Sequence, residues 1–361
     1  MGKGKKTNID FSIIIKLVDN STVNKEYKMV YFQGKSKKGK SIEKRDDIQL
    51  CENQIIISGH RESSDIFYNL ENNEFQTLYS STLYKNIIKT ICNYIILSKK
   101  LLFIEKINMN YNHFSLEFSA EKIYLFSKNK QNTNIPGIEA VNSDFLFSNN
   151  NKSKNFFDSF LYFVQALNEE ESYYKFERLY RALNILMDYQ GNTRVDTQAL
   201  NALTELCSAN KENFEESINF LLNTDMNIYD KLRWSNFIKN KHNWRNRPIE
   251  IITTITDSYL ISILLKRQKN LKEEEIESLE RNRLSDSISN EMRIDDYLKL
   301  ILCNYIYFVR CSFFHGELND AFFHLFTTTK LKDEFDFINS FLIILLIECY
   351  KNFSIFRDDD A

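Results

Sequence analysis

The side chains best suited to chemistry in this sequence are an arginine and a histidine close together, Arg310 and His315, in the segment FVRCSFFHGE. A histidine near neutral pH can both accept and donate a proton, whereas an arginine stays charged and can donate to two phosphate oxygens at once. Cleavage of a phosphodiester needs both properties, because protons move while negative charge builds up around phosphorus. The pair therefore indicates a phosphodiester site.

Apolar positions at helical spacing predict that this pair closes a long helix, which begins at about Asn290 and ends at Gly316, a glycine suited to the C′ position. Unpaired carbonyl groups at a helix C-terminus attract cations, so this end favours a protonated His315. Five residues turn an ideal helix by about 140° beyond a full turn, so the two side chains converge only if Arg310 reaches round the helix or the last turn is distorted. The alternative is that Arg310 pairs with a carboxylate and His315 caps the helix. The predicted apolar face consists of Ile294, Tyr297, Leu298, Ile301, Tyr305, Ile306 and Val309.

A second candidate site is the basic segment 230–248, which contains both tryptophans of the chain. Aromatic rings between cations suit stacking on unpaired bases while the cations follow the phosphates. The alternative is an amphipathic helix whose tryptophans are core residues and whose cations are solvated. The residues predicted to bind RNA are Lys231, Arg233, Trp234, Lys239, Lys241, Trp244, Arg245 and Arg247.

The segment GKSKKGKS, residues 34–41, has the spacing of a phosphate-binding loop. Such a loop must lead from a strand into a helix, whose N-terminus receives the phosphates. Here the continuation IEKRDDIQLCENQIIIS is charged and soon returns to strand character. The segment therefore predicts a lysine-rich hairpin loop that can touch RNA phosphates, with nucleotide binding as the alternative.

Composition sets limits on the class of protein. The chain has 361 residues, is 43% hydrophobic and carries a formal net charge of −2, so any nucleic-acid contact must come from local basic patches. Its six cysteines are scattered and lack metal-ligand spacing, which predicts no metal site, no cofactor and a reducing cytoplasm. The longest apolar run, FLIILLI, is shorter than a membrane span, and the N-terminal segment lacks the apolar region of a signal peptide.

The hydrophobic period changes once along the chain, and this change predicts two domains. Residues 1–150 contain short apolar runs separated by turn residues, with one helix after Ser80 or Ser81, which predicts an α+β domain. Residues 151–361 have apolar residues at three- and four-residue spacing and little glycine or proline, which predicts an all-α helical bundle.

In this helical setting, RCSFFH followed by glycine resembles the arginine-to-histidine motif of the HEPN superfamily, and YKFERLYRALNILMDY resembles the leading helix of its Apea-like branch. The resemblance covers about Asn155 to Phe353. It implies a metal-independent endoribonuclease that works as a homodimer with a composite active site, in which His315 is the general acid/base and Arg310 clamps the phosphate. Family settings imply toxin-like or antiviral defence, with an unknown trigger bound by residues 1–150.

RNA supplies the attacking 2′-hydroxyl in this chemistry, so the expected products are a 2′,3′-cyclic phosphate and a 5′-hydroxyl. The sequence departs from the family pattern in two places. Cys311 follows the arginine where many relatives have Asn, Asp or His, and Asn184 stands where the leading helix often has an acidic residue. The alternatives are a non-catalytic module of the same fold that binds nucleotide or RNA and dimerises, and a P-loop nucleotide-binding protein.

Overall fold

The computed structural model describes two compact units, residues 1–168 and 169–361, each with its own core. The described residues are 8–18, 23–35, 39–62, 82–111, 114–119, 135–239, 290–314 and 329–358, with Ile255, Asp257, Leu260, Ile261 and Leu264. In this part of the chain no helix has both the length and the apolar character needed to cross a membrane.

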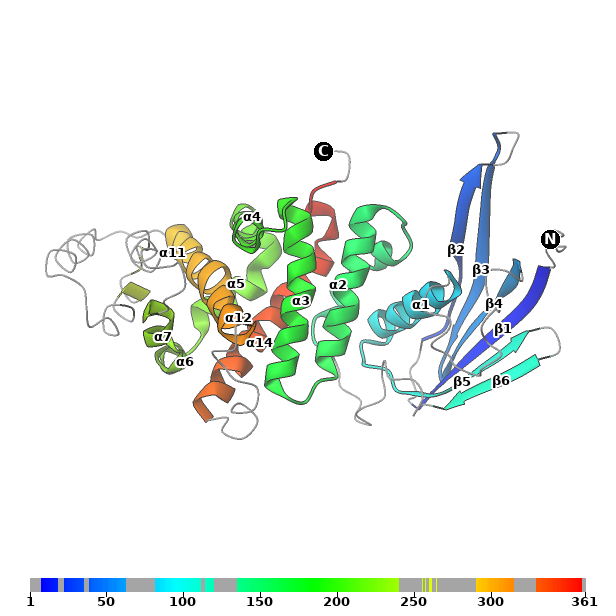
Figure 1. Cartoon of the computed structure of the whole chain (residues 1–361), viewed down its shortest axis with the longest axis horizontal. Helices are drawn as coiled ribbons and strands as arrows, with labels where there is room; N and C mark the ends of the chain where they lie inside the picture. The colour runs from blue at the N-terminus through cyan, green and yellow to red at the C-terminus, as the bar shows by residue number, and fades with distance from the viewer. Residues whose placement is uncertain are drawn as a thin grey trace, which may run out of the picture. The chain divides into compact units, whose positions relative to one another are not determined.

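Within the described residues of the first unit, six strands form one sheet in which every neighbouring pair is antiparallel (Figure 1). The order across the sheet is β2-β3-β4-β1-β5-β6, so β2 and β6 are its edge strands. The strands are β1 (Asn8–Leu17), β2 (Lys25–Lys35), β3 (Ser41–Cys51), β4 (Gln54–Glu62), β5 (Ile104–Tyr111) and β6 (Phe114–Ser119).

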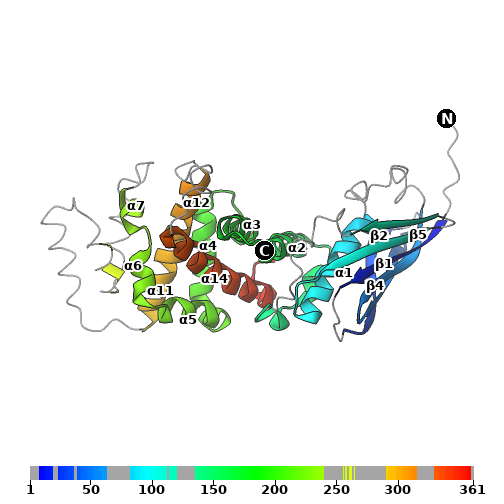
Figure 2. The same cartoon turned by 90° about the horizontal axis from the view of Figure 1, so that it is seen from below.

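The sheet forms because its strands carry apolar residues at every second position, which places them on one face. In β1 the buried positions are Ile9, Phe11, Ile13, Ile15 and Leu17. Helix α1 (Thr82–Ser98) lies across the sheet in both views (Figures 1 and 2), and eleven of its residues are buried. One face of the sheet and one side of α1 thus share the core of this unit.

A buried ion pair ties α1 to the sheet. Arg61 of β4 donates through Nε to Oδ1 of Asp46 in β3 at 3.1 Å, and both side chains are fully buried. Two side chains of α1 complete the cluster: Thr82 Oγ1 accepts from Arg61 Nη1 at 2.7 Å, and Asn86 Nδ2 donates to Asp46 Oδ2 at 2.7 Å. The guanidinium carbon lies 4.0 Å from the centre of the Tyr31 ring of β2. Because the charges are paired and hydrogen-bonded, their burial is tolerated.

Three further elements belong to the first unit: η5 (Ile138–Ala140), η6 (Ser143–Leu146) and α2 (Asn151–Leu167). The Phe145 ring lies 6.1 Å from the Phe156 ring and 5.7 Å from the Phe160 ring of α2. Lys89 Nζ of α1 lies 5.6 Å from the centre of the Phe157 ring. These contacts place α2 with the first unit, so the division falls after Asn168, whereas the sequence suggested 150.

The second unit is helical throughout its described residues. α3 and α4 form a hairpin, and α14 lies against α3 and α5 (Figure 2). The elements are α3 (Ser172–Gly191), α4 (Asp196–Ala209), η7 (Lys211–Phe214), α5 (Glu215–Asn223), α6 (Met226–Lys231), α7 (Trp234–Lys239), α11 (Asn290–Tyr297), η8 (Leu298–Tyr305), α12 (Ile306–Phe314), α14 (Thr329–Lys351) and η9 (Phe353–Ile355).

Aromatic packing and polar bonds hold α14 against its neighbours. The Phe335 ring lies 6.0 Å from that of Tyr173 and 5.4 Å from that of Phe176 in α3. Asn339 Nδ2 donates to the carbonyl oxygen of Ser172 at 2.7 Å. Farther along α14, the Glu348 carboxylate accepts from the Glu216 backbone N–H at 2.7 Å. Glu348 thereby supplies a cap for the first turn of α5, where N–H groups lack helical partners.

The helix that carries Arg310 is continuous from Asn290 to Phe314, but its central part, η8, is a π-helix. The amide of Ile306 donates to the carbonyl of Ile301, the i→i−5 bond that defines this geometry. Within η8 only Lys299 is exposed. The other seven positions are buried, so this stretch packs on all sides.

The predicted class, an α+β part followed by a mostly helical part, is confirmed at this level. The predicted helix after Ser81 corresponds to α1, and the predicted helix from about Asn290 is present as far as Phe314. The predicted strands at 65–79 and 123–127 and the charged segment 268–286 lie outside the described residues, as does most of the predicted helix at 249–268.

Replacing Arg61 by methionine should lower the free energy of unfolding of the first unit by about 3–5 kcal/mol, because Asp46 would stay buried without its cation. Chemical denaturation of the full chain followed by circular dichroism measures this change. The control is Lys28→Ala, which removes the exposed pair of Lys28 with Asp47 and should have a small effect. Equal, small effects of both variants would contradict the structural role of the buried pair.

Candidate functional site

Arg310 is the central residue of α12, which ends four residues later at Phe314. The prediction that it occupies the last turns of a long helix is therefore confirmed. His315 and Gly316 follow directly in sequence but lie outside the described residues. The geometry of the site is accordingly built around Arg310.

The guanidinium of Arg310 forms an ion pair with Asp196, with 3.2 Å between Nη2 and Oδ2. Asp196 begins α4, where the backbone N–H groups of the first turn favour a carboxylate. The side chains are 26% and 20% exposed, so both atoms of the pair lie at the boundary between core and solvent. This is the carboxylate partner that the alternative interpretation of Arg310 required.

Two tyrosine rings flank the same guanidinium. Its carbon lies 6.0 Å from the centre of the Tyr180 ring of α3 and 5.9 Å from that of Tyr307 of α12. Burial raises the pKa of Tyr180, and the negative charge of Asp196 adds to this, so the phenol stays neutral. For Arg310, burial acts to lower the pKa but the charge of Asp196 and its other neighbours outweighs it, so the pKa rises. Arg310 is thus a permanent cation between two neutral rings.

A second carboxylate lies near Asp196. Asp188 of α3 accepts a hydrogen bond from Asn184 Nδ2 at 2.9 Å, one helical turn earlier. Burial raises the pKa of Asp188, the charge of Asp196 raises it further, and Asn184 and Arg194 act in the opposite direction. The leading helix therefore does carry an acidic residue in this region. It is Asp188, one helical turn after Asn184.

The turn between α3 and α4 brings these groups together. Asn192 ends α3 in the left-handed conformation with φ +49°, and its amide donates to the carbonyls of Asp188 and Tyr189. At Gly191 a Cβ atom would lie 3.0 Å from the Cα atom of Ala199 in α4, so a glycine permits this close approach. The tight hairpin places the first residue of α4 beside the last two turns of α3.

The cluster of Tyr180, Asp188, Asp196 and Arg310 can hold the guanidinium in place and bind an anion that competes with Asp196. Sequence analysis identified Arg310 but not Asp196 or Asp188. The contact joins residues 114 positions apart in sequence (310 minus 196), and no local pattern links them. Asp196 showed only the weak signal of an acidic residue at a helix start.

The described part of the basic segment 230–248 is engaged within the protein. Arg233 Nε donates to Glu334 Oε2 of α14 at 2.6 Å, and its backbone N–H donates to the Tyr305 hydroxyl at 2.7 Å. Trp234 is fully buried, and its indole N–H donates to the carbonyl of Tyr229 at 2.7 Å. It therefore has no exposed face for a base in this structure, and its burial agrees with the alternative of a core tryptophan.

The other residues of that segment are placed only in part. Lys231 ends α6, and its Nζ lies 3.2 Å from Oδ2 of Asp333 in α14. Lys239 is the last residue of α7. Its side chain is not among those that the structure describes. The rest of the predicted RNA-binding residues lie outside the described residues, namely Lys241, Trp244, Arg245 and Arg247.

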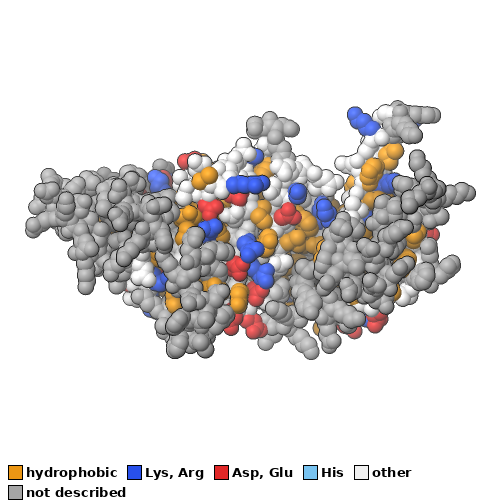
Figure 3. Space-filling model, in the orientation of Figure 1, with side chains coloured by type: hydrophobic (Ala, Val, Ile, Leu, Met, Phe, Trp, Pro, Cys, Tyr) orange, Lys and Arg blue, Asp and Glu red, His pale blue; other side chains and the backbone are white. Residues whose placement is uncertain are grey.

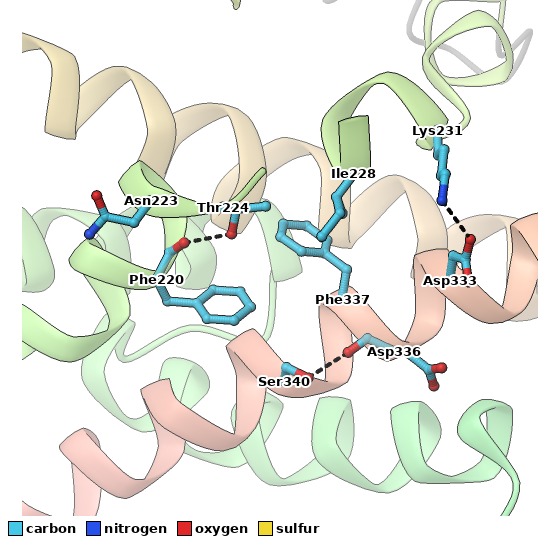
Figure 4. Close-up of a pocket in the computed structure, with 9 residues that line it drawn as sticks. All are labelled: Phe220, Asn223, Thr224, Ile228, Lys231, Asp333, Asp336, Phe337 and Ser340. Atoms are coloured by element: carbon cyan, nitrogen blue, oxygen red, sulfur yellow. Dashed lines mark hydrogen bonds and ion pairs between the residues drawn. The ribbon is translucent and has the colours of Figure 1, made fainter. Parts of the chain in front are cut away.

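An open pocket of about 580 Å³ lies between α5, α6 and α14 (Figure 4). The rings of Phe220 and Phe337, whose centres are 5.7 Å apart, stack at its floor. The paired Lys231 and Asp333 stand at one side, and Ser340 donates to the carbonyl of Asp336 at 2.7 Å. Aromatic floors with a polar rim suit a small planar or apolar group. This pocket was not anticipated from the sequence, because its residues come from three separate helices.

Residues 34–41 do not have the architecture of a phosphate-binding loop. β2 ends at Lys35, β3 begins at Ser41, and these two residues are paired across the antiparallel ladder. A strand, not a helix, follows the lysine-rich segment, so no helix N-terminus is available to receive phosphates. The predicted hairpin is confirmed for the described residues, and residues 36–38 lie outside them.

Within the described residues, no group of three or more His, Cys, Asp or Glu side chains lies close enough together to hold a metal ion. All six cysteines are described, and none forms a disulfide.

No protein-family model, curated protein or solved structure matches the chain. The cluster around Arg310 combines a cation at the edge of the core with two nearby carboxyl groups.

Replacing Asp188 by asparagine should stabilise the protein at about pH 7 and not at about pH 3. The folded protein holds the Asp188 proton more tightly than the unfolded chain, so this carboxyl favours folding below its unfolded pKa and loses that effect as pH rises through the folded pKa. Thermal unfolding at both pH values measures the difference. The control is Glu205→Gln in α4, which removes a carboxylate at an exposed position and should change the stability little.

Proposed function

We propose that this protein is a metal-independent endoribonuclease of the HEPN type that cleaves RNA through attack by the 2′-hydroxyl. The observation that carries the proposal is the position of Arg310. It is a permanent cation at the edge of the core, near the end of the helix that leads directly into His315. A guanidinium with one side in contact with solvent can reach a phosphate, whereas a fully buried one cannot.

In this proposal the roles follow from the chemistry of each group. His315 accepts the proton of the 2′-hydroxyl or donates one to the leaving 5′-oxygen. Arg310 donates to the equatorial oxygens of the phosphorane, where negative charge increases as the bond forms. Asp196 orients the guanidinium before the substrate arrives, and the phosphate replaces part of its contact. No cofactor takes part in these steps.

The expected assembly is a homodimer in which two such motifs face one cleft, so that each subunit contributes an arginine and a histidine. The expected setting is cytoplasmic, in toxin-like or antiviral defence, with a trigger that binds the first unit. These features are carried over from the HEPN resemblance of RCSFFH and of the leading helix α3.

A second candidate function is a non-catalytic module that binds RNA or nucleotide and dimerises. The Arg310–Asp196 ion pair favours it, because a neutralised arginine binds phosphate more weakly. The Cys311 thiol next to Arg310, with its Sγ 3.9 Å from Nη1, is the other departure from the usual motif. The two candidates make the same prediction for RNA binding and opposite predictions for product formation.

The decisive experiment incubates single-stranded RNA with the full chain and with His315→Ala, with and without EDTA. The wild type should cleave in EDTA and leave 2′,3′-cyclic phosphate and 5′-hydroxyl ends, identified by mass spectrometry. His315→Ala and Arg310→Ala should each lower the cleavage rate by at least about a hundredfold. The first variant removes proton transfer, and the second removes the stabilisation of charge on the phosphorane.

The matched control is Arg181→Ala. Arg181 lies on α3 and pairs with Glu177 on an exposed surface, so its loss should leave cleavage unchanged. Light scattering should give the same dimer mass for all variants. RNA binding without product in the wild type would favour the non-catalytic module, and cleavage that EDTA abolishes would contradict the metal-independent mechanism.

A further inference from the structure

The outer ends of β2 and β3 form a two-stranded arm that leaves the sheet. β3 pairs with β4 only from Asp47 onward, whereas its residues from Ser41 to Asp46 pair with β2 alone. In Figure 1 the paired ends of these two strands extend past the neighbouring strands. We refer to the described residues 30–35 and 39–45 as the β2–β3 arm. A hairpin without a third strand or a covering helix is only marginally stable in water. Packing therefore does not explain why the β2–β3 arm extends so far.

The arm is positively charged. Its described residues carry four cations and one acid, Glu43, a net charge of +3 (4 minus 1). Arg45 pairs with Glu43 at 3.0 Å, and the other three cations are Lys35, Lys40 and Lys44. The whole chain has a net charge of −2, so the arm is a local positive region in a chain that is close to neutral.

An exposed aromatic ring lies among these lysines. Phe32 is 47% exposed, and the Nζ atom of Lys44, its partner across the ladder, lies 5.7 Å from the ring centre. A Cβ atom at Gly34 would lie 2.8 Å from this ring, so the phenyl group covers the glycine backbone on one side. Ile42, opposite Gly34, is 38% exposed. Figure 3 shows Lys or Arg side chains beside hydrophobic ones at this end of the molecule.

Several contacts attach the base of the arm to the rest of the first unit. The Tyr31 ring lies 4.0 Å from the guanidinium carbon of Arg61, and the Tyr31 hydroxyl donates to the carbonyl of His60 at 3.0 Å. Asp46, the last residue of the separated part of β3, is held by Arg61 in the buried cluster. The arm is thus attached to the core of the first unit at the point where its two strands separate from the sheet.

Lysines on an edge strand can also serve to prevent pairing with a second sheet. Each strand of the arm has one open edge, so this role accounts for charges on both β2 and β3. It does not explain the exposed ring of Phe32 and the exposed Ile42, which promote association. A surface that combines lysines with a ring suits a polyanion with planar groups.

We propose that the β2–β3 arm binds single-stranded nucleic acid, with Lys35, Lys40 and Lys44 on phosphates and Phe32 against a base. The choice of RNA as the nucleic acid rests on the proposed function; the site itself is separate from Arg310. Binding through phosphates makes affinity fall with salt concentration, since each neutralised phosphate of a single strand adds about 0.7 to the slope of log K against log salt.

The test uses the full chain with His315→Ala, so that RNA stays intact, and fluorescence anisotropy of a labelled single-stranded uridine oligonucleotide over a salt series. The arm variant is Lys35→Gln with Lys40→Gln and Lys44→Gln. It should bind roughly tenfold more weakly at low salt, with a slope smaller by about 2. Phe32→Ala should weaken binding about tenfold without changing the slope.

The control variant removes the same charge from exposed positions elsewhere in the first unit, Lys25→Gln with Lys99→Gln and Lys154→Gln. It should bind as the parent does. Equal losses in the two triple variants would overturn the proposal, because they would indicate a general charge effect. Arm-dependent binding of anionic lipid vesicles but not of nucleic acid would also overturn it, whereas binding of a DNA strand but not of the RNA strand would overturn the choice of RNA. If arm-dependent RNA binding is found and the wild type produces no cleavage, the proposed function fails and this inference stands.

Discussion

The ion pair between Arg310 and Asp196 is the interaction on which the candidate site depends. An arginine at the edge of a helical core needs a counter-charge to be held in one place, and a phosphate ligand would need the same cation. The pair therefore orients the guanidinium and would compete with a phosphate ligand. Its position depends in turn on the tight α3–α4 turn at Gly191 and Asn192 and on the course of the helix that ends with α12.

Three arginines that form ion pairs differ in how much of the side chain is exposed. Arg61 has a fully buried side chain and Arg233 one that is 11% exposed, and each is paired with a fully buried carboxylate. Arg310 is 26% exposed and its partner is at the surface as well. The first two join elements of the core, β3 to β4 and the start of α7 to α14, and the carboxylate of each pair is out of contact with solvent. Of the three pairs, that of Arg310 is the one in which both side chains contact solvent.

The sequence predicted those features that local periodicity controls. Alternation in residues 9–17 predicted β1, and the helical stripe from Ile294 to Val309 predicted the helix that leads to Arg310. It could not reveal that α2 packs with the first unit, since an amphipathic helix does not indicate which core it covers. Nor could it tell a core Trp234 from an exposed one, because both fit a basic amphipathic segment. The Asp196 partner and the π-helical stretch depend on tertiary contacts that have no local pattern.

The π-helical stretch η8 also constrains how this chain can change in length. A π-helical turn accommodates one more residue than an α-helical turn over the same span. Loss of a single codon within 298–305 would let the stretch return to α-helical geometry and preserve the helix itself. Because the π-helical turn absorbs the extra residue, the residues beyond it, Arg310 among them, would keep nearly the same direction. A one-residue deletion between Ile306 and Arg310, where the helix is α-helical, would instead rotate Arg310 by about 100° away from the α3–α4 hairpin.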